Sequence, residues 1–129
     1  MPASERPRAP RPVLFATLVV AGSSAGIIVF SRSHRYLGAR TDLDEALLRA
    51  LAPDCEPDLI RPHLAAIPRI AAGDQAAGPI ARLSTAERFH WLVAPSSTMI
   101  QPSEVHTGLT DDPAAELEHL FNLLVIGRR

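Results

Sequence analysis

The fold is decided by residues 13–30, which read VLFATLVVAGSSAGIIVF and include no charged side chain. A turn-forming segment, GSSAG at residues 22–26, divides this run into two apolar pieces, Leu14–Val20 and Ile27–Ser31. β-Branched and aromatic side chains are frequent in both pieces, and such side chains favour strands over helices. The run therefore predicts two buried β-strands that are joined by a turn.

Two other interpretations of the same run stay open. Arg6, Arg8 and Arg11 precede it, and basic residues before an apolar stretch are typical of a secretory signal peptide. Eighteen uncharged residues also just reach the length of a transmembrane helix, which would make residues 13–30 a membrane anchor. Glycine, serine and threonine lower the hydropathy at its centre, so the two-strand interpretation is favoured. Residues 1–12, with four prolines and three arginines, are expected to form a disordered leader.

Helical patterns dominate the rest of the chain. Apolar residues recur at helical spacing, behind capping residues or prolines, near residues 43–51, 57–72, 85–94 and 113–126. Pro62 and Pro68 predict a kink, or a division into two short helices, in the second segment. Extended pieces are expected at Arg35–Thr41, Thr98–Gln101 and Glu104–His106. The sequence therefore predicts a single α+β domain over residues 13–129, with a small amino-terminal sheet packed against about four helices. Its expected core residues are Ile28, Phe30, Leu47, Leu51, Leu64, Phe89, Leu92, Leu120, Phe121 and Leu124.

Charge and cysteine content exclude several classes of function. Thirteen arginines and no lysine stand against fourteen acidic residues, so the net charge of −1 gives no bulk attraction to nucleic acid. The single cysteine, Cys55, excludes an internal disulfide and a cysteine-based zinc site, and it fits a reducing cytoplasm. The five histidines show no metal-binding spacing. We therefore expect a cytoplasmic protein without a metal or another cofactor.

The densest group of polar side chains lies between residues 88 and 108, where Arg88 precedes a hydroxyl-rich loop. Ligand binding there would use Arg88 as an anion anchor, Gln101 as an amide hydrogen-bonding group and His106 as a titratable group. The favoured interpretation is that the loop's polar side chains, which include Ser96, Ser97 and Thr98, satisfy its own backbone. No nucleophile–base pair, carboxylate pair or metal cluster is identified. The sequence thus favours a non-catalytic interaction or accessory module, with a small enzyme or ligand-binding protein as the alternative.

A family resemblance covers most of the chain. The segment Ala86–Gly108, AERFHWLVAPSSTMIQPSEVHTG, is followed by LTDDP and an amphipathic helix, and it resembles the carboxy-terminal half of the bacterial domain-of-unknown-function 3037 family. Ala25–Arg40 and Leu43–Ala52 resemble the family's glycine-led strand and first helix, so the resemblance spans about residues 25–125. The sequence departs from the pattern at Ala21–Ala25, where family members carry a polar stretch.

The resemblance has implications for location and partners. It implies a bacterial, soluble protein in which residues 27–30 form a sheet strand. It also implies a protein partner, a toxin-type protein kinase encoded nearby, while a homo-oligomer would cover an exposed strand edge or helix face equally well.

Overall fold

The computed structural model describes residues 9–94 and 99–129. Within these residues, a five-stranded antiparallel sheet is covered by helices on both faces. The strands are β1 (Arg11–Val20), β2 (Ser23–Ser31), β3 (Tyr36–Thr41), β4 (Ile100–Pro102) and β5 (His106–Thr110). The α-helices are α1 (Glu45–Leu51), α2 (Pro57–Ala71), α3 (Thr85–Val93) and α4 (Pro113–Leu124), and the short 3-10 helices are η2 (Gln75–Ala77), η3 (Pro79–Arg82) and η4 (Ile126–Arg128). The predicted α+β fold is confirmed.

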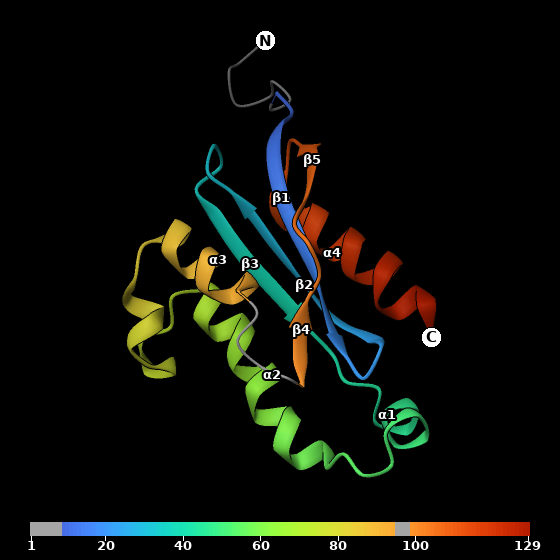
Figure 1. Cartoon of the computed structure of the whole chain (residues 1–129). Coiled ribbons are helices and arrows are strands. Elements are labelled where there is room, and N and C mark those ends of the chain that lie inside the picture. Colours follow the sequence, from blue (N-terminus) through green and yellow to red (C-terminus); the bar gives the residue numbers. More distant parts are fainter. Residues whose placement is uncertain (1–8, 95–98) are drawn as a thin grey trace.

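Strands β1 and β2 form the central hairpin of the sheet (Figure 1). Leu14 pairs with Phe30, so the apolar run of the sequence folds back on itself as predicted. The turn is shorter than expected: only Ala21 and Gly22 form it, with φ angles of +50° and +81°, and the next residues already belong to β2. Two-residue hairpin turns require such positive φ angles. The two-strand interpretation of residues 13–30 is therefore confirmed.

The bounds of β1 differ from the sequence-based expectation. This strand begins at Arg11, inside the stretch that was expected to be a leader, whereas residues 1–8 lie outside the described part of the chain. No helix among the described residues is both long and apolar enough to cross a membrane.

The outer edge of β1 pairs with two short strands in succession. β5 lies along its first half and β4 along its end, and residues 103–105 connect the two. The Ser103 amide donates to the Thr17 carbonyl at 2.7 Å, while the Thr17 amide donates to the Ser103 hydroxyl oxygen at 2.9 Å. These bonds hold the segment after residue 99 on the sheet. The expected extended piece at Thr98–Gln101 begins outside the described residues, and β5 starts only at His106.

The predicted helices are all found, and side-chain caps fix the starts of α1, α3 and α4. Ser84 caps α3 by accepting from the Glu87 amide, and Asp112 caps α4 by accepting from the Ala115 amide. The first helix begins later than the sequence suggests, because Asp44 is its cap. Of the two alternatives predicted for α2, a kink or a division into two helices, the division is wrong, since the helix continues from Pro57 to Ala71 through both interior prolines. Its apolar face is buried, and this burial outweighs the lost backbone bonds.

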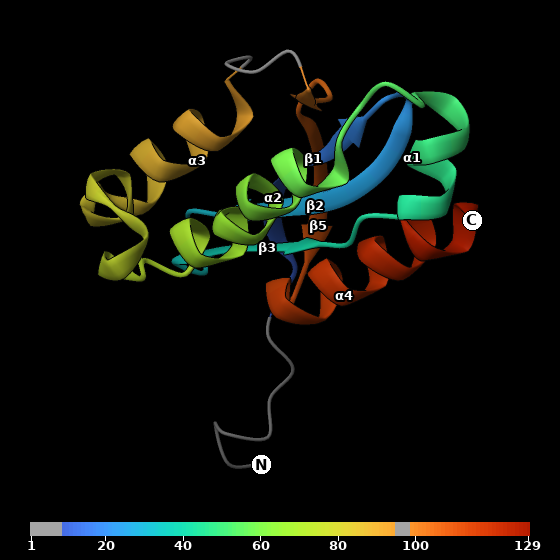
Figure 2. The same cartoon turned by 90° about the horizontal axis from the view of Figure 1, so that it is seen from below.

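Each face of the sheet carries its own core. Figure 2 shows the sheet between α2 and α3 on one side and α4 on the other. On the first side, Phe30 of β2 stacks on Phe89 of α3 with ring centroids 4.8 Å apart. On the second side, the buried residues are Val13, Ile27, Val29, Leu117, Leu120, Phe121 and Val125. Of the predicted core, Leu47 and Leu124 are half-buried, and Leu51 is 55% exposed, which corrects that prediction. In the short helix α1, Leu48 takes the buried position instead.

Candidate functional site

Arg88 of α3 joins the ends of two helices. Its guanidinium donates from Nη1 to the Leu83 carbonyl at 2.6 Å and from Nη2 to the Ala71 carbonyl at 3.3 Å. Ala71 is the last residue of α2, and Leu83 lies just before α3. The carbonyl groups at the end of a helix have no partner within that helix, and the Arg88 side chain donates to one such carbonyl in each of these two segments. The Nε atom is buried and has no hydrogen-bond partner among the described residues.

Gln101 and His106 lie on the outer strands. Gln101 of β4 is exposed and pairs with Val19 of β1. His106 of β5 pairs with Phe15 of β1. The His106 ring lies on the Phe15 ring, with centroids 5.4 Å apart and an interplanar angle of 32°. Phe15 packs with the α4 side of the sheet, whereas α3 lies on the other side. The sheet therefore lies between Arg88 and His106. The hydroxyl residues Ser96, Ser97 and Thr98 lie outside the described residues.

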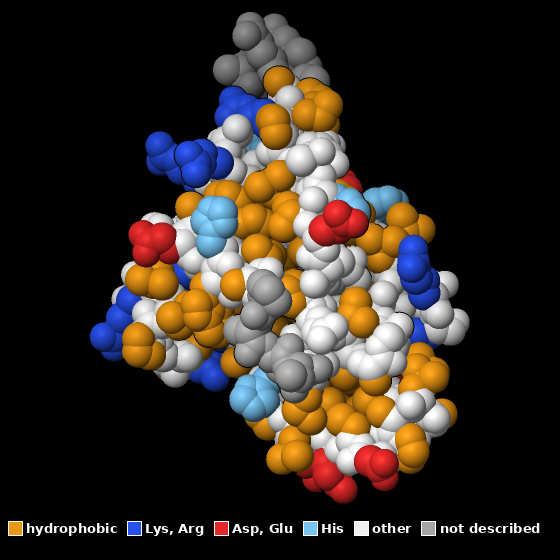
Figure 3. Space-filling model, in the orientation of Figure 1, with side chains coloured by type: hydrophobic (Ala, Val, Ile, Leu, Met, Phe, Trp, Pro, Cys, Tyr) orange, Lys and Arg blue, Asp and Glu red, His pale blue; other side chains and the backbone are white. Residues whose placement is uncertain are grey.

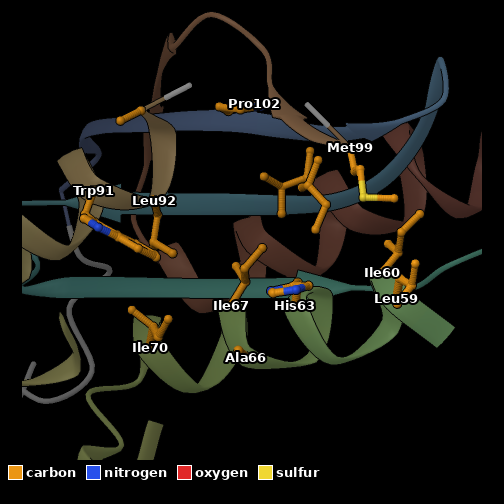
Figure 4. Close-up of a pocket in the computed structure, with 13 residues that line it drawn as sticks. Leu59, Ile60, His63, Ala66, Ile67, Ile70, Trp91, Leu92, Met99 and Pro102 are labelled. Carbon is orange, nitrogen blue, oxygen red and sulfur yellow. The ribbon is translucent and has the colours of Figure 1, made fainter. Parts of the chain in front are cut away.

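A groove of about 380 Å³ opens between α2, α3 and β4. We call it the apolar groove, and Figure 4 shows its side chains. It is lined by Leu18, Leu59, Ile60, His63, Ala66, Ile67, Ile70, Trp91, Leu92, Ala94, Met99, Ile100 and Pro102. In Figure 4, Trp91 lies at one end and Leu59 at the other, with His63 and Ile67 of α2 between them. Its volume falls in the range of pockets that hold a ligand or an inserted side chain.

Large apolar side chains of the groove stay open to solvent. Leu59 is 60% exposed, Trp91 is 44% exposed and Met99 is 37% exposed. Hydrophobic side chains also gather on this face in Figure 3. Scattered exposed apolar residues are ordinary, but a group of them around one concavity marks a binding surface. Trp91 is the only tryptophan of the chain, so it also reports on this groove in solution.

Acidic side chains border one end of the groove. Asp54 and Glu56 are exposed and directly precede α2, whose first two turns carry Leu59 and Ile60. Figure 3 shows acidic side chains at this end of the molecule, where α1 is joined to α2. The described residues here are the acidic Glu45, Asp54, Glu56 and Asp58 and the basic Arg49 and Arg61. Arg61 pairs with Asp58 at 2.6 Å and with Glu45, so the excess charge is negative.

Sequence reasoning missed the groove residues Leu59, His63, Trp91 and Met99. Leu59 and His63 lie one turn apart on α2, beside the predicted apolar face. A signal was present, because α2 carries apolar residues, Leu59 among them, besides the four that the fold buries. The contributions of α3 and β4 lie about 30 to 40 residues further along the chain, and no local pattern joins them to α2.

Titratable groups with shifted pKa values lie outside the apolar groove. Burial raises the pKa of Tyr36 above its usual range, and the carboxylates of Glu118 and Asp112 add to this. The pKa of Asp74 is lowered, chiefly by its hydrogen bond from Arg69 and then by the amide of Ala76. The part of the chain that the structure describes contains no group of three or more potential metal ligands.

Fold and groove together define a class of small α+β domain in which helices cover both faces of an antiparallel sheet and one face carries an open apolar groove. The family model described as "Protein of unknown function (DUF3037)" matches residues 24–125, and the chain belongs to this family. The match extends from β2 to α4 and confirms the resemblance seen in the sequence, while β1 precedes it. No curated protein matches the chain. No solved structure matches it either.

Proposed function

We propose that this protein is a non-catalytic interaction module, which binds an apolar segment of a partner protein, flanked by basic residues, in the apolar groove. The observation that carries this proposal is the open arrangement of Leu59, Trp91 and Met99 around one concavity. Tryptophan and methionine are enriched at protein interfaces, and tryptophan is frequent among the residues that contribute most to binding.

The shape of the groove favours a helical segment. Its wall follows α2 from Leu59 to Ile70, which is about 16 Å at the rise of an α-helix. A partner helix of three turns would fit this length and present apolar side chains at helical spacing to the groove. The lining comes chiefly from α2, α3 and β4, and the exposed side chains of Leu59, Trp91 and Met99 give a bound segment access from solvent.

The acidic end of the groove sets the orientation of the bound segment, and the concave shape of the groove argues against a second copy of this chain as the occupant. The acidic end of the groove, at Asp54 and Glu56, would attract lysine or arginine at one end of the bound segment. In a symmetric dimer the groove would face the same groove, and two concave surfaces would leave the volume unfilled. A foreign helical segment fills it.

The cellular location and the class of partner are part of the same proposal. The resemblance described in the sequence analysis implies a bacterial protein, and the single cysteine favours a reducing cytoplasm as its location. A toxin-type protein kinase encoded nearby is the partner class to test first.

Selection from a random-peptide display library tests the proposal. The whole chain serves as bait, and the enriched peptides are then measured by fluorescence anisotropy against Leu59→Ser and against Leu123→Ser. Leu123 is a matched control, because it is a helical leucine of similar exposure, 55% against 60%, on α4. We expect apolar residues at helical spacing with lysine or arginine at one end. Leu59→Ser should weaken binding about tenfold, and Leu123→Ser should not.

Several results would overturn the proposal. Enriched peptides that bind both variants equally would place the binding surface elsewhere, and so would a library without enrichment. Sedimentation of the chain alone adds a further test. A dimer that Leu59→Ser dissociates and Leu123→Ser does not would make a second copy the occupant, against the foreign segment proposed here.

A further inference from the structure

A second concavity lies on the other side of the sheet, beside the end of α4. We call it the polar cleft. It has a volume of about 350 Å³ and is lined by Phe15, Thr17, Ser24, His106, Leu124 and Arg128. These residues come from the β1–β2 hairpin, from β5 and from the consecutive helices α4 and η4, so distant segments of the chain meet here. The cleft shares no lining residue with the apolar groove.

We propose that the polar cleft binds a small organic oxyanion, a carboxylate or a phosphate monoester attached to an apolar group. The described residues that line the cleft supply a fixed positive charge, hydroxyl groups and an imidazole, and none of them is acidic. This site is independent of the apolar groove and of its partner.

The two arginines at the end of the chain have different environments. Arg129 pairs with Asp42, and its Nε lies 4.0 Å from Asp44, so its charge is already neutralised within the fold. Arg128 is exposed, lines the polar cleft and forms no ion pair with any described residue. A guanidinium in this position can donate two parallel N–H bonds to one carboxylate or phosphate. Arg128 is therefore the anion anchor of the site.

His106 and the hydroxyl groups complete the polar lining. The His106 ring packs at a tilt against the Phe15 ring, and the register of β5 against β1 places it at the cleft. A neutral imidazole still donates from one nitrogen, so the ring can bind an oxyanion oxygen without being charged. The hydroxyls of Thr17 and Ser24 have no hydrogen-bond partner within residues 9–94 and 99–129. These groups can donate to the remaining oxygens of the ligand.

Apolar walls narrow the class of ligand. The side chains of Phe15 and Leu124 line the same cleft, and both are half-buried. An inorganic ion would leave this apolar surface in water, whereas an organic oxyanion covers it and gains from its burial. The volume also exceeds what a single inorganic ion fills. We therefore assign the site to an oxyanion with an apolar substituent.

Titrations followed by amide NMR test the site on the full chain, with phenyl phosphate, benzoate and inorganic phosphate as probes. We expect saturable shifts at Ser24 and His106 with phenyl phosphate or benzoate, and at least tenfold weaker binding of inorganic phosphate. Whichever organic probe binds more tightly identifies the anionic group. Arg128→Gln should weaken binding about tenfold, and His106→Gln should weaken it severalfold. The matched control Arg82→Gln removes an exposed arginine of η3 and should leave binding unchanged.

The opposite results would overturn the inference. Shifts that do not saturate, or that are the same in Arg128→Gln, would mean that the cleft holds no anion. Equal affinities for inorganic phosphate and phenyl phosphate would show that the apolar walls do not contribute to ligand binding. Leu59→Ser should bind the probes normally, so a failure of the groove proposal would not be confused with a failure of this one.

Discussion

Replacement of Arg88 by methionine tests whether this arginine holds the fold together. The substitution keeps a long apolar stem and removes the guanidinium that donates to the carbonyls of Ala71 and Leu83. Hydrogen bonds from charged donors contribute about 1.5–3 kcal/mol each. The Leu83 bond is exposed, so we count it at the low end or below, and the Ala71 bond is partly buried at 3.3 Å. We expect a loss of about 2 kcal/mol in the free energy of unfolding.

Urea unfolding, followed by circular dichroism, measures this loss. In thermal unfolding the same change lowers the midpoint by roughly 8 °C for a domain of this size. Arg88→Lys should lose nearly as much, because a lysine cannot reach two carbonyls at once. Arg82→Met is the control and should change stability by less than about 0.5 kcal/mol. A loss below that value in Arg88→Met would refute the structural role and leave the guanidinium free to bind a ligand.

The core and the titration of Tyr36 provide two more predictions. Phe89→Ala removes the ring that stacks on Phe30 and should cost about 3–5 kcal/mol in urea unfolding, so a cost under about 1.5 kcal/mol would contradict the packing of α3 on the sheet. Burial, Glu118 and Asp112 raise the pKa of Tyr36 in the folded chain. The unfolded chain therefore loses the tyrosine proton first, so the free energy of unfolding should keep its full value below about pH 10 and decline above it. The chain has no lysine and one tyrosine, so Tyr36→Phe should flatten this decline, and equal slopes between pH 9 and 11 would contradict the raised pKa.

Local signals in the sequence were sufficient for much of the fold. The uncharged run at residues 13–30 predicted the hairpin, and the capping residues and prolines ahead of residues 85–94 and 113–126 predicted where α3 and α4 begin. The pairing of β4 and β5 with β1 was not predictable, because strands of three and five residues carry little pattern. Their place depends on non-local bonds such as those between Ser103 and Thr17.

The candidate site was harder to predict for the same reason. An arginine ahead of a hydroxyl-rich loop gives the same sequence pattern whether it binds a ligand or backbone carbonyls. In the structure, Arg88 donates to the carbonyls of Leu83 and Ala71. The sequence singled out His106, and the structure places it in the lining of the same cleft as Arg128, about twenty residues further along the chain. Such contacts depend on how α4 packs across the sheet, which the pattern of one segment does not specify.

Fluorescence of Trp91 tests the central claim, the apolar groove as a docking surface, most directly. This residue is the chain's only tryptophan, is 44% exposed and lines the groove, so a docked apolar segment must change its surroundings. Titration with a peptide from the display selection should shift its emission to shorter wavelength and saturate at one peptide per chain. The same titration of Leu59→Ser should need about ten times more peptide. An emission spectrum that stays unchanged while anisotropy reports full binding of the peptide would contradict the account.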